Sequence, residues 1–236
     1  MYSDLKNHIK PFDLIAFRGG DVISDLIAIL EKYEVGADTF THVGIVVTSE
    51  ILPNQNLDPD KLYILESTFA YQIPLIYDNK PDVITGRGHF GVILRDLEEI
   101  INWYICNDKT KVAWCKLLNN PVINNDLITK FEQFFDSYHN RTYDMDLLGL
   151  FGAIFPQIRG LRDLQDKLLN KMFKRIKGKD FPAWQFCSEL VANAYQLIGV
   201  IDQKFDSKNV LPIDFFGYDR DGIPKLVCEP IYFNKF

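Results

Sequence analysis

The chain has 236 residues, with 26 Lys plus Arg against 32 Asp plus Glu and a formal net charge of −6. A composition of 47% hydrophobic and 25% charged residues is that of an ordinary globular protein, which excludes disorder as the main state. The acidic total argues against a protein that coats nucleic acid, and four Cys do not make a disulfide framework.

The predicted elements begin with strands that are separated by turns and one helix. Short apolar or β-branched runs predict strands at 13–17, 41–47 and 62–67. A helix-like pattern occupies 22–33, and 52–60 is polar with two Pro, which predicts a loop. The first part of the chain therefore predicts a hairpin with a long connection.

The second part of the chain adds strands and most of the helices. Strands are predicted at 90–94, 111–118 and 226–233, and helices at 96–103, 125–138 and 186–198, with a mostly helical segment at 144–177. Gly199 follows the helix at 186–198 as its C-cap. This order predicts an α+β chain with an antiparallel sheet and late helices.

The N-terminus and the apolar runs of the chain indicate whether it carries a secretory signal or a membrane-spanning segment. The N-terminus has no apolar segment after a basic start, so we expect no secretory signal. The longest apolar run, 147–155, has nine residues, whereas a spanning helix needs roughly 20. We therefore expect no transmembrane segment and a cytoplasmic, intracellular or virion protein.

Cys187 falls in the first turn of the helix predicted at 186–198. Unpaired backbone N–H groups and the helix dipole favour a thiolate at this place, and the thiolate is the nucleophilic form of cysteine. Cys187 also shares an apolar helix face with Leu190 and Val191, which fits a small core residue equally well. The other three thiols are interpreted as structural core residues: Cys106, Cys115 and Cys228.

A cysteine nucleophile needs a base, and the base needs an orienting group. His42 opens the most β-prone run of the chain, where a polar ring needs a partner or a purpose. Glu66 ends the next predicted strand, so antiparallel pairing would bring it near His42. The register decides whether the two side chains share a face, and a solvent-exposed Glu66 fits the pattern too. The other histidines are His8, His89 and His139.

Four short motifs stand in order along the chain: FDLI at 12–15, THVGIV at 41–46, LES at 65–67 and CSELV at 187–191. This set resembles the circularly permuted branch of the NlpC-like papain-fold superfamily, in particular the YiiX-like hydrolases and related proteins of large DNA viruses. Tyr143-Asp144 and LPID at 211–214 extend the resemblance over most of the chain.

The resemblance implies a single permuted papain-like domain over 1–236, with 144–180 as a helical insertion. By position, Cys187 is then the nucleophile, His42 the general base and Glu66 the orienting group. The implied reaction is hydrolysis of an amide, or acyl transfer from an ester, through a thioester. The N–H of Cys187 is a candidate donor to the tetrahedral intermediate, and the candidate side chains are Tyr143 and Gln185. We expect no cofactor and no metal.

The segment 157–180 carries eight basic and three acidic residues, a net of +5, which leaves −11 for the rest of the chain. Apolar residues recur in it at helical spacing. It could be a helix with a solvated basic face, a peripheral contact with an anionic membrane, or a lid over the thiol.

The substrate remains open between a peptide-like amide and a lipid, as in an acyltransferase or phospholipase. A catalytically silent binding or virion protein of the same fold is the non-enzymatic alternative. We expect no nucleic-acid partner, and the oligomeric state is left open. The loops at 52–60 and 71–88 are expected to supply pocket walls.

Overall fold

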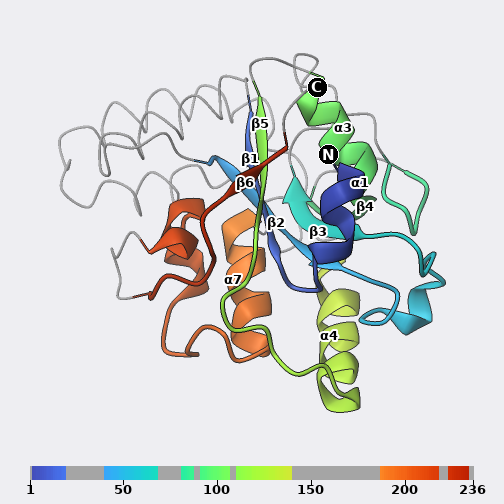
Figure 1. Cartoon of the computed structure of the whole chain (residues 1–236). Coiled ribbons are helices and arrows are strands. Elements are labelled where there is room, and N and C mark those ends of the chain that lie inside the picture. The colour runs from blue at the N-terminus through green and yellow to red at the C-terminus, as the bar shows by residue number, and fades with distance from the viewer. Residues whose placement is uncertain are drawn as a thin grey trace, which may run out of the picture.

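The computed structural model describes residues 2–19, 40–68, 81–87, 91–106, 110–139, 187–217 and 223–233. Its centre is a six-stranded antiparallel sheet in the order β4-β3-β2-β1-β5-β6 (Figure 1). The strands are β1 (Leu14–Arg18), β2 (His42–Val47), β3 (Tyr63–Thr68), β4 (Gly91–Asp96), β5 (Lys111–Cys115) and β6 (Ile231–Tyr232). The predicted α+β class with an antiparallel sheet is confirmed.

Helices lie on both faces of the sheet (Figure 1). They are α1 (Tyr2–Leu5), α3 (Leu97–Ile105), α4 (Asn125–Tyr138) and α7 (Cys187–Leu197), with short 3-10 turns at Lys6–His8, Pro53–Gln55, Ser207–Asn209 and Pro212–Phe216. The helices predicted at 96–103, 125–138 and 186–198 are therefore present, with small changes at their ends.

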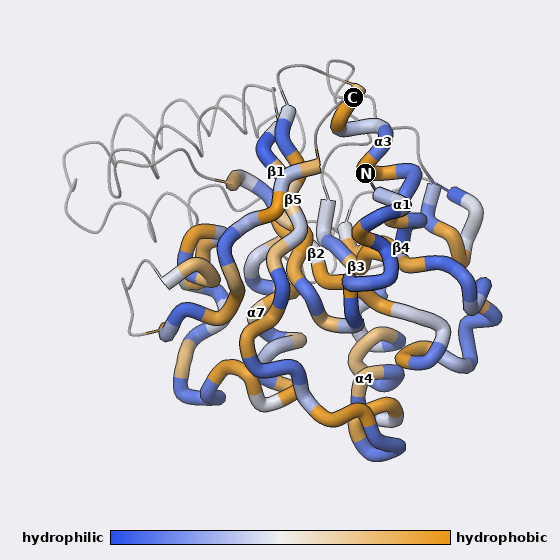
Figure 2. The backbone as a smooth tube through the Cα atoms, in the orientation of Figure 1, coloured by the Kyte–Doolittle hydropathy of each residue, from blue (hydrophilic) through white to orange (hydrophobic). Residues whose placement is uncertain are grey.

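Side chains of each strand alternate between two apolar clusters, as the pleat requires. Val43 and Ile45 of β2 join the cluster that contains α7 and α4. Val46 and Ile64 join the cluster on the opposite face, which contains α3 and α1. Figure 2 shows how apolar residues run along the central strands between the two helical layers.

Two hydrogen bonds fix α7 to the rest of the molecule. The hydroxyl of Tyr195 donates to the carbonyl of Phe12 at 2.9 Å, and that of Ser188 donates to the carbonyl of Val210 at 2.6 Å. Gly199 ends the helix with φ +76°, a conformation that glycine adopts without steric cost. The predicted C-cap is thus confirmed, and the first turn of α7 has a fixed position.

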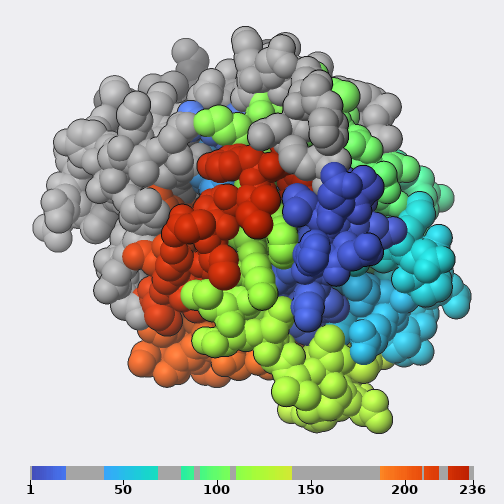
Figure 3. Space-filling model, viewed as in Figure 1, coloured from blue at the N-terminus to red at the C-terminus, as the bar shows by residue number. Residues whose placement is uncertain are grey.

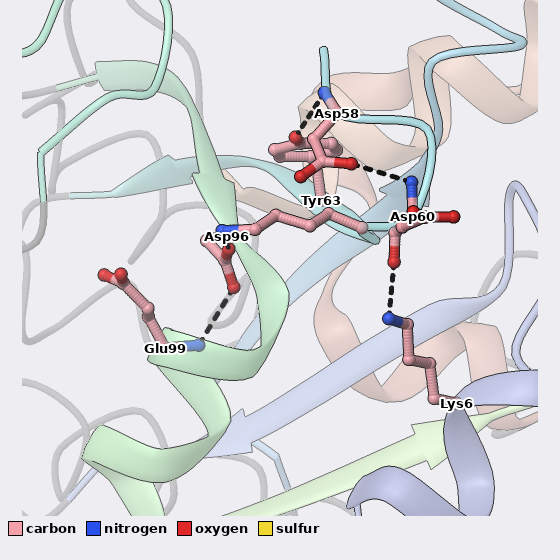
Figure 4. A network of polar contacts seen from close by, with 7 residues as sticks. Lys6, Asp58, Asp60, Tyr63, Asp96 and Glu99 are labelled. Carbon is pink, nitrogen blue, oxygen red and sulfur yellow. Dashed lines mark hydrogen bonds and ion pairs between the residues drawn. The ribbon is translucent and has the colours of Figure 1, made fainter.

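The loop between β2 and β3 is held by its own polar contacts (Figure 4). The N–H of Asp58 donates to the Tyr63 hydroxyl, and the N–H of Asp60 donates to Asp58, both at 2.9 Å. The ammonium of Lys6 donates to the carbonyl of Asp60. The loop lies at the opposite end of the hairpin from His42, so the prediction that 52–60 walls the site is wrong.

The C-terminal segment covers β5 and the chain that follows it, as the red and green surfaces of Figure 3 show. The strand predicted at 226–233 is shorter, because only Ile231–Tyr232 and an isolated bridge between Leu117 and Val227 form. Pro230 lies between these two pieces and has no N–H to donate to a ladder.

Several predicted features lie outside the described residues: the helix at 22–33, most of the loop at 71–88, the apolar run 147–155, the insertion 144–180 and its basic part 157–180. Among the described residues, no helix is long and apolar enough to cross a membrane.

Candidate active site

His42 and Glu66 lie on one face of the sheet, on neighbouring strands. The register of β2 and β3 places Gly44 opposite Glu66, so Glu66 is one diagonal step away from His42. The Nε2 of His42 lies 2.5 Å from Oε2 of Glu66. The contact expected from antiparallel pairing is therefore present, and Glu66 is fully buried rather than exposed to solvent.

Gly44 makes this diagonal contact sterically feasible. A Cβ at position 44 would lie 2.7 Å from side-chain carbons of Ile64 and 3.0 Å from the Cβ of Glu66. These separations are shorter than side-chain carbons tolerate without a shift of one of the groups. The glycine in the His-Val-Gly run thus leaves space on the sheet for Glu66 and for the neighbouring Ile64.

Cys187 is the first residue of α7, which packs against β2 and β3. Cys187 is 5% exposed and belongs to the apolar cluster on the α7 face, and its thiol lies close enough to His42 to raise the pKa of the imidazole. Because Nε2 of His42 faces Glu66, Nδ1 is the ring nitrogen left for the sulfur. The two interpretations of Cys187, core residue and neighbour of a base, are thus compatible.

The His42 ring rests on an aromatic side chain of the next strand. The ring centroids of His42 and Phe17 are 5.3 Å apart, and Phe17 in turn packs on Tyr104 of α3 at 4.6 Å. Phe17 is opposite His42 in the register of β1 and β2. The imidazole is therefore held between an aromatic ring and a carboxylate.

Arg95 is a buried cation beside Glu66 that the sequence analysis did not single out. Its Nη2 and Nε lie 2.5 Å and 2.7 Å from Oε1 of Glu66. Arg95 is 2% exposed and lies on β4, where Ile93 is opposite Glu66. The predicted strand at 90–94 ended one residue short of it. Had the strand been extended by one residue, Arg95 would have shared a face with Ile93, which is opposite Glu66, and would have been predicted to lie beside that carboxylate.

The charges of these groups shift two pKa values in opposite directions. Burial alone lowers the pKa of His42, but the charge and hydrogen bond of Cys187, followed by those of Glu66, outweigh it and raise the pKa to about 10. Burial raises the pKa of Glu66, and the Arg95 charge together with the His42 hydrogen bond holds it below its usual value. A carboxylate and an imidazolium are therefore the favoured forms.

The remaining thiols differ from one another. Cys115 is buried, and burial raises its pKa well above the ordinary value. Cys228 is half-buried, and Cys106 is exposed at the C-terminal end of α3. The interpretation as a core residue is therefore wrong for Cys106, because its helix ends at the surface.

The other described histidines, His8 and His139, lie in the N-terminal turn and at the end of α4. His8 is exposed in the N-terminal turn. His139 ends α4, where its Nε2 lies 2.8 Å from Asp82 and its ring stacks on Phe135. These contacts fix the end of α4. His89 lies outside the described residues.

The candidate side-chain donors for a tetrahedral intermediate, Tyr143 and Gln185, lie outside the described residues too. Within the described part of the chain, no group of three or more His, Cys, Asp or Glu could hold a metal ion. A cavity of about 310 Å³ lies between α4 and the C-terminal end of α7, lined by Val122, Lys130 and Ile198 among others. It is at the wrong end of α7 to admit substrate to Cys187.

Comparison with known proteins adds no relative from which a function could be transferred. No protein-family model matches the chain, and no curated protein matches it significantly. The chemistry that the site can perform therefore follows from the properties of Cys187, His42, Glu66 and Arg95 themselves.

Proposed function

We propose that the chain is a cysteine-dependent hydrolase that cleaves a peptide-like amide bond through a thioester intermediate. The observation that carries the proposal is the chain of contacts from Cys187 to His42 and from His42 to Glu66. Nucleophile, base and orienting group are the three parts that thiol hydrolysis needs, and each touches the next.

The proposed reaction follows from these contacts. His42 Nδ1 holds the proton of the Cys187 thiol as an imidazolium, and the thiolate sulfur attacks the carbonyl carbon. When the tetrahedral intermediate collapses, the C–N bond breaks and the leaving amine takes the proton from His42. Water, deprotonated by His42, then attacks the thioester and releases the acid and Cys187. Glu66 holds the ring and stabilises its protonated form throughout.

The order of these residues along the chain supports a permuted papain-like fold as part of the proposal. His42 and Glu66 come from strands that precede the cysteine helix, as in the permuted NlpC-like and YiiX-like proteins that the motifs resemble. The α+β class and the position of Cys187 at the start of α7 agree with that assignment.

The proposal is tested by trapping the acyl-enzyme. The chain is incubated with a pool of peptide amides that carry diverse side chains, and intact-mass and peptide mass spectrometry locate any acyl group. We expect acylation on Cys187 in the wild-type chain, none in Cys187→Ser, and at least about 100-fold slower amide cleavage in His42→Ala. Cys106→Ser and His8→Ala, which change exposed residues outside the site, serve as matched controls and should behave like the wild type.

An ester substrate is the second candidate, in a lipid acyltransferase or phospholipase of the same chemistry. The sequence of 147–180 favours it, because an apolar run precedes a segment with a net charge of +5. The same trapping experiment with anionic phospholipid vesicles separates the two, since a fatty acyl group on Cys187 identifies the ester reaction. Vesicle binding that salt abolishes would support the membrane contact proposed for 157–180.

A catalytically silent binding or virion protein predicts no acylation of Cys187 with either substrate class. The sequence of interactions from Cys187 through His42 to Glu66 counts against it. Equal behaviour of the wild type and His42→Ala with both substrates would favour this non-enzymatic role.

A further inference from the structure

We infer that Arg95 is a positioning residue for the cysteine chemistry and supplies the charge that balances the buried site. The inference rests on the proposed function, because it assigns Arg95 a role that acts through Glu66 and His42 on Cys187. Arg95 is not proposed to contact the substrate.

The guanidinium of Arg95 holds one side of the Glu66 carboxylate. Its Nη2 and Nε both contact the same carboxylate oxygen, Oε1. The other oxygen, Oε2, faces Nε2 of His42. The guanidinium therefore fixes the rotation of the carboxylate, and the carboxylate in turn fixes which ring nitrogen of His42 remains for Cys187.

The register of the sheet also places Arg95 beside Glu66. Along β3 and β4, Glu66 is opposite Ile93, and Arg95 is opposite Ile64. Arg95 therefore lies one diagonal step from Glu66, just as His42 does on the other side of β3. The three side chains form a row across β2, β3 and β4 on one face of the sheet, with the carboxylate in the centre.

Arg95 also balances the charges of a buried group of side chains. Glu66 is fully buried, Arg95 is 2% exposed and the side chain of His42 is 16% exposed. In the reactive form, Arg95 and His42 are positive, and Glu66 and Cys187 are negative, so the group is neutral. Without Arg95 the same form has one uncompensated negative charge, which favours uptake of a proton by Glu66 or by the sulfur. Either uptake depletes the thiolate–imidazolium pair.

The experiment measures the rate at which iodoacetamide alkylates Cys187 between pH 5 and pH 10, with peptide mass spectrometry to separate the thiols. In Arg95→Met we expect alkylation about tenfold slower at pH 7, with the half-maximal rate moved to higher pH. Arg95→Lys keeps the charge without the planar fork, so its rate should fall between the two. Arg87→Met, which removes an exposed arginine from the 83–87 turn, is the matched control and should match the wild type.

A double-mutant cycle separates positioning from a purely structural role. If Arg95 acts through Glu66, Arg95→Met should change the alkylation rate by less than about twofold in a Glu66→Gln background. Thermal unfolding of every variant shows that each compared chain is folded. If Arg95→Met does not fold, Arg95→Lys decides alone, since a slower rate supports the inference and an unchanged profile overturns it.

The outcomes distinguish failure of this inference from failure of the proposed function. If His42→Ala alkylates as fast as the wild type, Cys187 is not activated and the proposed function fails. If His42→Ala is slow but the folded Arg95 variants keep the wild-type rate and profile, only the role of Arg95 is overturned. The role of Arg95 is also overturned if Arg95→Met slows alkylation by the same factor in the Glu66→Gln background as in the wild type.

Discussion

A row of charged and polar side chains crosses three strands of the sheet: His42, Glu66 and Arg95. Each lies on the face that otherwise packs apolar residues against α1 and α3. Buried charges are costly unless they are paired, and Glu66 satisfies this condition on both of its oxygens. The three polar side chains therefore replace apolar ones within this cluster, and they are stable there because they pair with one another.

The first residue-scale prediction concerns pH. The pKa of His42 is raised from about 6.5 to about 10, so its charged form stabilises the folded chain. That contribution is fully present below the unfolded pKa and is lost as pH rises through about 10. We expect the free energy of unfolding of the wild type, relative to His42→Gln, to fall by at least about 1 kcal/mol between pH 7 and pH 10.5. Denaturant titrations at both pH values check this, and a constant difference would contradict it.

The second residue-scale prediction concerns Gly44. Gly44→Ala places a Cβ 2.7 Å from carbons of Ile64, so we expect a loss of about 1–3 kcal/mol in the free energy of unfolding. Since Glu66 must also shift, alkylation of Cys187 should slow. Adding Ile64→Val removes one of the crowded carbons and should recover part of the stability. A Gly44→Ala chain as stable as the wild type would show that the sheet relaxes around the methyl group.

At the scale of elements, the position of Cys187 depends on how α7 is anchored. The buried Tyr195 hydroxyl donates to the carbonyl of Phe12, a residue with φ +70° two positions before β1. Tyr195→Phe leaves that carbonyl without this donor, and we expect a loss of about 1–3 kcal/mol, measured by urea unfolding. Tyr232→Phe changes a tyrosine that is 41% exposed and is the control. Equal effects of the two substitutions would argue against the anchor.

Local patterns were sufficient to predict most elements of the described chain. The strands at 13–17, 41–47 and 62–67 and the helix at 125–138 have clear apolar periodicity, and the structure has all four. The strand predicted at 226–233 was too long, because its apolar pattern continues through Pro230, which cannot donate a hydrogen bond to the neighbouring strand. Loop 52–60 was predicted correctly as the connection of the hairpin, but the connection lies at the opposite end of the strands from His42.

The site was only partly predictable, because its contacts depend on strand register. Antiparallel pairing of the two strands was enough to predict that Glu66 lies near His42. That the two side chains lie on the same face of the sheet follows only from the register, in which Gly44 is opposite Glu66. Arg95 is 29 positions from Glu66 along the chain, and only a strand extended to residue 95, together with the register of β3 and β4, places it beside Glu66. The sequence therefore points to Cys187, His42 and Glu66 and leaves out the buried cation beside Glu66.

At the scale of the whole molecule, two layers meet at Cys187 and His42. His42 is the first residue of β2 and Cys187 the first residue of α7. The ring packs on Phe17 from the α3 layer, whereas the sulfur belongs to the α7 layer. The contact between them therefore forms at the end of the strand, where a side chain can reach from one face of the sheet to the other.

The order in which the four thiols are alkylated tests the central claim most directly. Accessibility alone predicts that Cys106, which is exposed, reacts before Cys187, which is 5% exposed. Activation by His42 predicts the opposite order, because the thiolate rather than the thiol reacts. With limiting iodoacetamide at pH 6.5, we expect mass spectrometry to find Cys187 modified first in the wild type and Cys106 first in His42→Ala. Modification of Cys106 first in both chains would contradict the account.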